Sequence, residues 1–117
     1  MNAEPRLQVR FYRTAAAGKE PVREWLKALR PDERKIIGDD LKTAQYGWPL
    51  GMPLIRKLEV GLWEVRSRMG DRIARVIVTV EGDTMVLLHG FIKKSEKMPI
   101  QDLQLARQRL RALHEEL

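Results

Sequence analysis

The spacing of apolar residues in the first half of the chain predicts one strand followed by two helices. Residues 7–12 alternate apolar and polar side chains, as a half-buried strand does. After Pro21, a residue that the first turn of a helix tolerates, apolar side chains recur at positions 22, 25, 26 and 29. A second helix opens at Pro31 and places apolar side chains at positions 37, 41 and 44 on one face. Gly47 and Pro49 end this helix, and residues 50–53 form a loop.

The second half of the chain predicts three strands and a final helix. The runs 62–67, 72–80 and 84–93 are strand-like and are separated by turns short enough for hairpins. From Pro99 the helical period returns, with leucine or alanine at positions 103, 106, 110, 113 and 117. The order β-α-α-β-β-β-α indicates a single α+β domain over residues 1–117. We expect the helices on one face of a small, mainly antiparallel sheet, with the other face left available.

Strand periodicity divides the side chains of residues 62–68 into two sets. Trp63 and Val65 point to one face of the sheet, whereas Glu64, Arg66 and Arg68 point to the other. An apolar pair opposite a charged trio indicates a core side and a solvated side. Taken singly, Arg66 or Arg68 is better explained by an ordinary cross-strand pair with a glutamate, and Glu64 could serve Arg75 or Arg66 in this way.

The next two strands carry further basic residues. Arg75 interrupts the apolar stretch Ile73-Ala74-Arg75-Val76-Ile77-Val78, and an arginine in such a strand favours a functional role. Arg72 has the opposite parity and is not grouped with Arg75. The third of these strands leads into the lysine-rich segment Lys93-Lys94-Ser95-Glu96-Lys97. His89 lies in an apolar stretch, where a satisfied core or edge position is the simpler interpretation, and His114 is placed on the surface.

Composition narrows the chemistry. The net charge of +6 favours a polyanionic partner: nucleic acid, an acidic protein segment or a membrane surface. The absence of cysteine excludes disulfides, a thiolate nucleophile and cysteine-based zinc sites. No metal-binding histidine spacing and no phosphate-binding glycine loop occur, so we expect neither a metal nor another cofactor.

The location of the protein is predicted from the lack of long apolar segments. The longest apolar runs are a few residues, far from the roughly 20 that span a bilayer. The first residues contain no apolar stretch of the kind found in a signal peptide. We therefore expect a cytoplasmic protein without a membrane partner.

Three segments together resemble a known family. They are Gly61-Leu62-Trp63-Glu64-Val65-Arg66, the pair Arg75-Val76, and Leu87-Leu88-His89-Gly90-Phe91-Ile92-Lys93-Lys94-Ser95-Glu96-Lys97-Met98-Pro99, followed by Ala106. They resemble the phage-derived, HigB-like branch of the RelE/ParE toxin superfamily, and the likeness extends over essentially the whole chain. The resemblance implies a RelE-like fold, with two N-terminal helices and a C-terminal helix packed on the sheet.

The resemblance also implies a function. It implies the toxin of a toxin–antitoxin pair, an endoribonuclease that cleaves mRNA without a metal, in the ribosome, and inhibits translation. Its implied partners are mRNA, the ribosome and a cognate helix-turn-helix antitoxin. By motif position, Arg75 resembles the phosphate-stabilising arginine, Arg66 a basic residue of the preceding strand, and Lys94 a second basic position. We expect RNA-binding roles for further basic residues, namely Arg68, Arg72, Lys93 and Lys97.

The chain departs from the family pattern at the groups that move protons. RelE-type enzymes use a tyrosine near the chain end, and the tyrosines here are Tyr12 and Tyr46. The clustered C-terminal histidines of some HigB toxins are also missing. Acid–base catalysis would then fall to Glu64, His89, a lysine of depressed pKa, or the ribosomal RNA. Two other functions stay open: a ParE-like gyrase inhibitor, and a non-catalytic relative that binds its antitoxin or nucleic acid.

Overall fold

The computed structural model describes residues 4–94 and 96–116, which form three helices and one five-stranded sheet. In chain order the elements are β1 (Gln8–Phe11), α1 (Pro21–Ala28), α2 (Pro31–Gly47), β2 (Ile55–Glu59), β3 (Leu62–Met69), β4 (Arg72–Glu81), β5 (Thr84–Lys93) and α3 (Ile100–Glu116). The predicted α+β class is confirmed, and every element that the sequence predicts is present within a few residues of its expected bounds.

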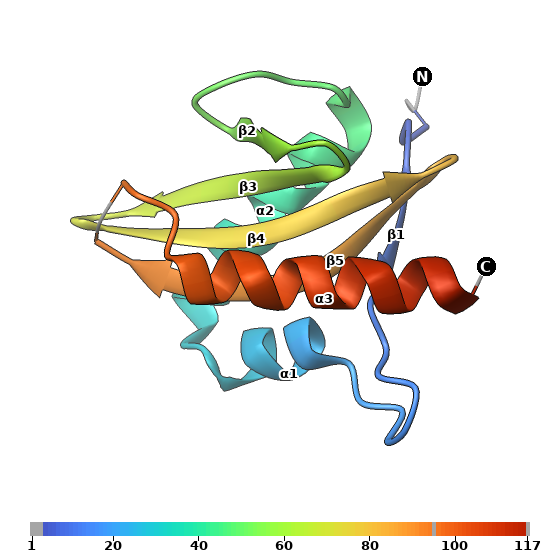
Figure 1. The fold of residues 1–117 in the computed structure, drawn as a ribbon. Helices are drawn as coiled ribbons and strands as arrows, with labels where there is room; N and C mark the ends of the chain where they lie inside the picture. Colours follow the sequence, from blue (N-terminus) through green and yellow to red (C-terminus); the bar gives the residue numbers. More distant parts are fainter. Residues whose placement is uncertain (1–3, 95, 117) are drawn as a thin grey trace.

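The sheet is mixed, with the spatial order β1-β5-β4-β3-β2. Strands β2 to β5 form an antiparallel meander, and β1 pairs with β5 in parallel. The turns at Gly70 and Gly82 close the two long hairpins with φ of +66° and +59°, a region that side chains other than glycine rarely adopt. The β5–α3 connection lies at the same end of the sheet as the β3–β4 turn (Figure 1).

The predicted element order lacks one strand, β2. Ile55 packs with the core on one face of the sheet and Leu58 with the core on the other, so apolar residues do not alternate with polar ones. A register shift between Lys57 and Glu59 breaks the pairing with β3 as well. The sequence of this short edge strand does not alternate between apolar and polar residues. It therefore cannot be distinguished from the loop that precedes it.

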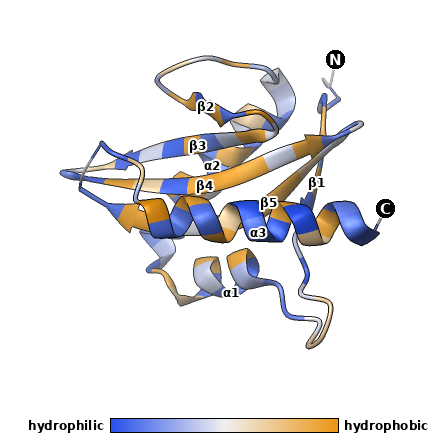
Figure 2. Ribbon diagram, in the orientation of Figure 1, coloured by the Kyte–Doolittle hydropathy of each residue, from blue (hydrophilic) through white to orange (hydrophobic). Residues whose placement is uncertain are grey.

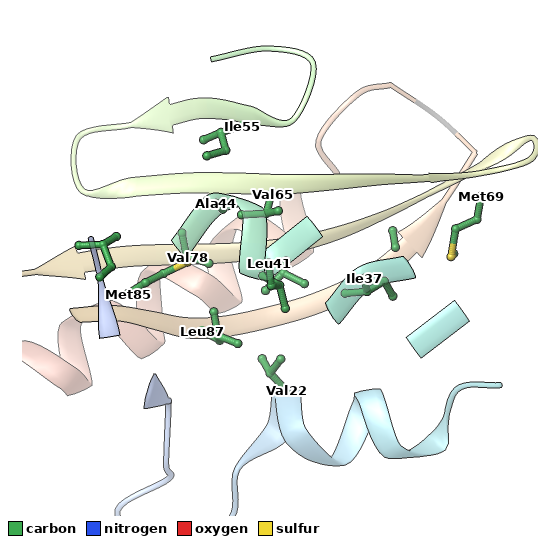
Figure 3. Close-up of a cluster of buried hydrophobic side chains, with 13 residues drawn as sticks. Val22, Ile37, Leu41, Ala44, Ile55, Val65, Met69, Val78, Met85 and Leu87 are labelled. Carbon is green, nitrogen blue, oxygen red and sulfur yellow. The ribbon is translucent and has the colours of Figure 1, made fainter. Parts of the chain in front are cut away.

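The prediction that all helices share one face of the sheet is wrong. Helices α1 and α2 pack on one face, with a core of 13 buried residues that includes Val22, Ile37 and Val65 (Figure 3). Helix α3 packs on the opposite face, where Ala106 and Leu113 join a second buried cluster. The three central strands are hydrophobic along much of their length, with hydrophilic positions interrupting β3 and β4 toward their common turn (Figure 2). Strands that are apolar on both faces require cover on both faces.

The glycine of the His-Gly-Phe segment has a packing role. Trp25 of α1 lies directly over Gly90 of β5, and a Cβ built on Gly90 would come within 2.4 Å of two atoms of the indole ring. No side chain fits at such a distance unless the tryptophan and its helix move. Gly90 therefore sets how closely α1 approaches the sheet.

We expect Gly90→Ala to destabilise the fold by about 1–3 kcal/mol, because the added methyl group overpacks a close helix–sheet contact. Urea unfolding followed by circular dichroism measures the change. The matched control is Gly38→Ala in α2, where a Cβ meets no atom within 4 Å. There alanine should stabilise the helix by roughly 0.5–1 kcal/mol. Equal effects of the two substitutions would contradict the assigned role of Gly90.

Candidate active site

Glu64, Arg66 and Arg75 lie together on the face of the sheet against which α3 packs. Arg66 and Arg75 are direct partners across β3 and β4, and Glu64 precedes Arg66 by two residues on the same face. Glu64 and Arg75 are each 0% exposed, and Arg66 is also buried. The predicted parity of these residues is correct, but the prediction that their side of the strand is solvated is wrong for Glu64 and Arg66.

Arg56 completes the group from β2. It is the register partner of Glu64, and its Nη2 lies 2.9 Å from Oε1 of that carboxylate. Nε of Arg66 lies 3.5 Å from the same oxygen, and Nε of Arg75 lies 4.0 Å from Oε2. We call Arg56, Arg66, Arg75 and Glu64 the arginine cluster. Arg56 was missed in the sequence because its strand was missed.

Burial governs the protonation of the arginine cluster. It raises the pKa of Glu64 above its ordinary value, and the attraction of Arg56, Arg75 and Arg66 opposes this shift without overcoming it. Burial likewise lowers the pKa of Arg75, against the attraction of Glu64. An arginine stays charged in proteins, so the cluster carries three cations around one carboxylate and has an excess of positive charge.

Residues of two loops contact the arginine cluster. Nη1 of Arg75 donates to the carbonyl oxygen of Lys97 over 3.1 Å, and Arg66 contacts the sulfur of Met52. The side chain of Arg66 also pairs with the carboxylate of Glu96. Ala106 and Leu113 of α3 belong to an apolar cluster on the same face of the sheet.

Two depressions adjoin the arginine cluster. A pocket of about 230 Å³ is lined by residues that include Arg66, Arg68 and Leu54. A groove of about 510 Å³ runs between β2 and the segment before α3, with Arg56, Lys57 and Lys97 among its basic residues and Leu58, Met98 and Leu103 among its apolar ones. Arg56, whose side chain is 32% exposed, connects the groove to the buried carboxylate.

His89 belongs to a separate network. Its Nε2 lies 2.6 Å from a carboxylate oxygen of Asp102 in α3, and Nη1 of Arg109 lies 3.5 Å from its Nδ1. The ring of Phe91 stacks on His89 and also lies beside the guanidinium of Arg75. Phe91 thus lies between His89 and the arginine cluster, and both nitrogens of His89 already face charged partners.

The remaining predicted site residues are spread around this end of the sheet. Arg68 is exposed and lies 3.9 Å from Glu96, and Lys94 pairs with Asp71 in the β3–β4 turn. Arg72 points to the opposite face, where it pairs with Glu33 of α2. Lys93 is the register partner of Ile73 at the end of β5, and Lys97 lines the groove. The structure therefore brings Arg66, Arg75 and Glu64 together and leaves Lys94, Arg72 and His89 outside the cluster.

The described residues 4–94 and 96–116 contain no group of three or more His, Cys, Asp or Glu side chains that could hold a metal ion. They also contain no helix that is long and apolar enough to span a membrane.

The chain is thus a three-layer α+β domain with a cluster of arginines set into its sheet, and guanidinium groups bind the oxygens of carboxylates and phosphates. Residues 24–111 match the model of the phage-derived Gp49-like proteins (DUF891), and the chain belongs to this family. The family lies within the RelE/ParE-like toxin superfamily and is consistent with the toxin of a toxin–antitoxin system. A comparison with curated protein sequences gives no match.

The raised pKa of Glu64 makes a prediction about stability. A folded-state pKa above the ordinary value of 4.5 means that the folded protein holds a proton that the unfolded chain has lost, so stability falls as the pH rises through this range. We expect Glu64→Gln to remove this loss, and its unfolding free energy relative to the original chain should increase from pH 4.5 upward. Urea unfolding over a pH series measures the difference.

Glu59→Gln is the control of opposite sign. The hydrogen bond from Arg107 lowers the pKa of Glu59, so its contribution to stability is present at higher pH and is lost as the pH falls. Relative to the original chain, this variant should lose stability as the pH rises. If Glu64→Gln followed the same trend as Glu59→Gln, attraction by the arginines would outweigh burial at Glu64.

Proposed function

We propose that this chain is a HigB-like toxin that inhibits translation in the cytoplasm by cleaving mRNA, without using a metal ion. The observation that carries the proposal is the convergence of Arg56, Arg66 and Arg75 on one small region of the sheet. Membership of a toxin superfamily supports the toxin role. The excess of positive charge in the arginine cluster supports action on a phosphodiester.

The reaction would use the 2′-hydroxyl of the RNA as nucleophile. Its oxygen attacks the adjacent phosphorus in line with the 5′-oxygen, a cyclic 2′,3′-phosphate forms, and the P–O5′ bond breaks. Negative charge accumulates on the non-bridging oxygens as the phosphorane forms. Guanidinium groups held in a low-dielectric site stabilise that charge more in the transition state than in the ground state.

Each member of the arginine cluster would have a distinct part in this step. Arg75 is enclosed and oriented by the carbonyl oxygen of Lys97, and it provides a fixed charge beneath the phosphate. Arg66 and Arg56 are more accessible and reach the pocket and the groove on either side. The carboxylate of Glu64 holds the guanidiniums side by side, where their mutual repulsion would otherwise separate them.

The two titratable groups predicted to transfer protons, Glu64 and His89, are both enclosed or engaged by other residues. Glu64 has a raised pKa, which suits an acid–base group, but its carboxylate is fully enclosed by the three arginines. His89 is engaged by Asp102 and Arg109. We assign the proton transfers to the ribosomal RNA, in line with a toxin that cleaves mRNA in the ribosome.

The proposed partners follow from the same charges. An antitoxin with an acidic segment would complement the basic residues around the groove and cover the arginine cluster. By the family resemblance this antitoxin is a helix-turn-helix protein. Its binding would suppress the toxin by excluding RNA.

Substitution of the arginine cluster should abolish toxicity. Induction of the chain alone should arrest growth and produce discrete new 5′ ends in mRNA. We expect Arg75→Ala to reduce cleavage by about 10²- to 10³-fold, the usual cost of losing one preorganised charge-stabilising donor. Because Arg75 is buried, Arg75→Lys and the more exposed Arg56→Ala should be tested beside it, with folding checked by thermal melting.

The matched control is Arg10→Ala, which removes an exposed arginine paired with Glu116 and should retain full toxicity. Full activity of folded Arg75→Lys and Arg56→Ala would place the active site elsewhere. DNA breaks without mRNA cleavage would indicate a gyrase inhibitor. An absence of growth arrest would indicate a non-catalytic relative.

A further inference from the structure

Glu96 differs from Glu64, the carboxylate of the arginine cluster, in its exposure. Its side chain is 64% exposed, whereas that of its partner Arg66 is 8% exposed. The other oxygen of Glu96 lies 3.9 Å from Nη2 of Arg68, an exposed arginine two residues farther along β3. One solvent-facing carboxylate thus sits between two guanidiniums at the open side of a buried cationic group.

Glu96 occupies a position beside Arg66 and Arg68 that an anion from solution could also occupy. Within the arginine cluster, Glu64 balances one of three positive charges, and Glu96 supplies the second carboxylate. Arginine forks bind carboxylate and phosphate oxygens with similar geometry, so the place of one can be taken by the other. A phosphate group brings more oxygens to the same pair of guanidiniums.

Glu96 also lies where the two depressions meet. It lines the groove beside Arg56 and Lys97, and it contacts Arg66, which lines the neighbouring pocket. Glu96 belongs to the connection between β5 and α3 and to neither element. Of the two ion pairs of Glu96, the one with Arg68 is exposed on both sides and contributes little to stability, whereas at the buried Arg66 the incoming anion takes the place of the carboxylate. Displacement of Glu96 therefore requires no change in the sheet or in α3.

We propose that Arg66 and Arg68 form a phosphate-binding position in which Glu96 is the resident anion, and that a phosphate of the bound polynucleotide displaces it. The identification of this phosphate with RNA rests on the proposed function, whereas the anion position itself does not. Glu96 then acts as an internal competitor, which weakens the binding of single phosphates and of non-cognate anions. A strand that also contacts the more exposed Arg56 overcomes this competition.

Binding of inorganic phosphate tests the anion position directly. We expect Glu96→Gln to bind phosphate about threefold to tenfold more tightly than the original chain, because one carboxylate no longer competes for the two guanidiniums. Isothermal titration calorimetry at low ionic strength measures the affinity. Addition of Arg68→Gln to Glu96→Gln should remove most of the gain.

Glu116→Gln is the matched control. It changes the net charge by the same amount and breaks an exposed pair with Arg10, outside the arginine cluster. Its phosphate affinity should stay within twofold of the original chain. If Glu96→Gln and Glu116→Gln bound phosphate equally, the gain would reflect net charge alone and the inference would be overturned.

Binding of a non-cleavable RNA, such as a 2′-O-methyl oligonucleotide, separates this inference from the proposed function. Glu96→Gln should bind it more tightly, because a phosphate no longer has to displace a carboxylate from Arg66 and Arg68. If Glu96→Gln gains affinity for phosphate but the original chain neither binds nor cuts RNA, the anion position stands and the proposed function fails. If the original chain cuts RNA but Glu96→Gln gains no affinity for phosphate, the inference fails alone.

Discussion

The burial of a carboxylate among three guanidiniums is the constraint on which the charged end of this sheet depends. Glu64 is fully enclosed, and its three arginine neighbours come from three adjacent strands, β2, β3 and β4. Removal of each ion from water costs several kcal/mol. Burial raises the pKa of Glu64 and lowers the pKa of Arg75, and both shifts favour the neutral form of the group. Apolar residues of similar volume would stabilise this region at least as well. Stability alone therefore does not account for these charges.

The arrangement also explains why residues of two loops contact the arginine cluster. Helix α3 buries Ala106 and Leu113 against apolar positions such as Ile77 and Leu88. The carboxylate of Asp102 in α3 is engaged by His89, and the guanidiniums need polar partners from elsewhere. The residues before α3 supply such partners, through the carbonyl oxygen of Lys97 and the carboxylate of Glu96. Such loop cover over a charged site can exchange its contacts with a ligand while the packed core stays intact.

Much of the fold could be predicted from the sequence because its elements have clear periods. The long strands β3, β4 and β5 and all three helices follow from apolar spacing, and strand parity correctly separated Glu64 and Arg66 from Trp63 and Val65. The edge strand β2 could not be found in this way, because it places apolar residues on both faces over five positions and contains a register shift. Because β2 was not predicted, Arg56 could not be assigned to a strand or to a face of the sheet. Its pairing with Glu64 therefore could not be predicted. The error about the solvated side has a related cause: parity tells which residues share a face and does not tell what covers that face.

The two corrections together change the chemistry of the site. An exposed cationic sheet would bind any polyanion with low selectivity, since solvent and salt screen its charges. A cluster enclosed by loops, with Arg75 buried and Arg56 and Arg66 opening to a groove and a pocket, acts at close range and at a lower effective dielectric. The same enclosure prevents Glu64 from reaching a substrate proton and makes it a support for the arginines. A site of this kind can stabilise charge on a phosphate strongly but has little capacity for proton transfer of its own, so the proposed cleavage would need proton transfers from groups outside the chain.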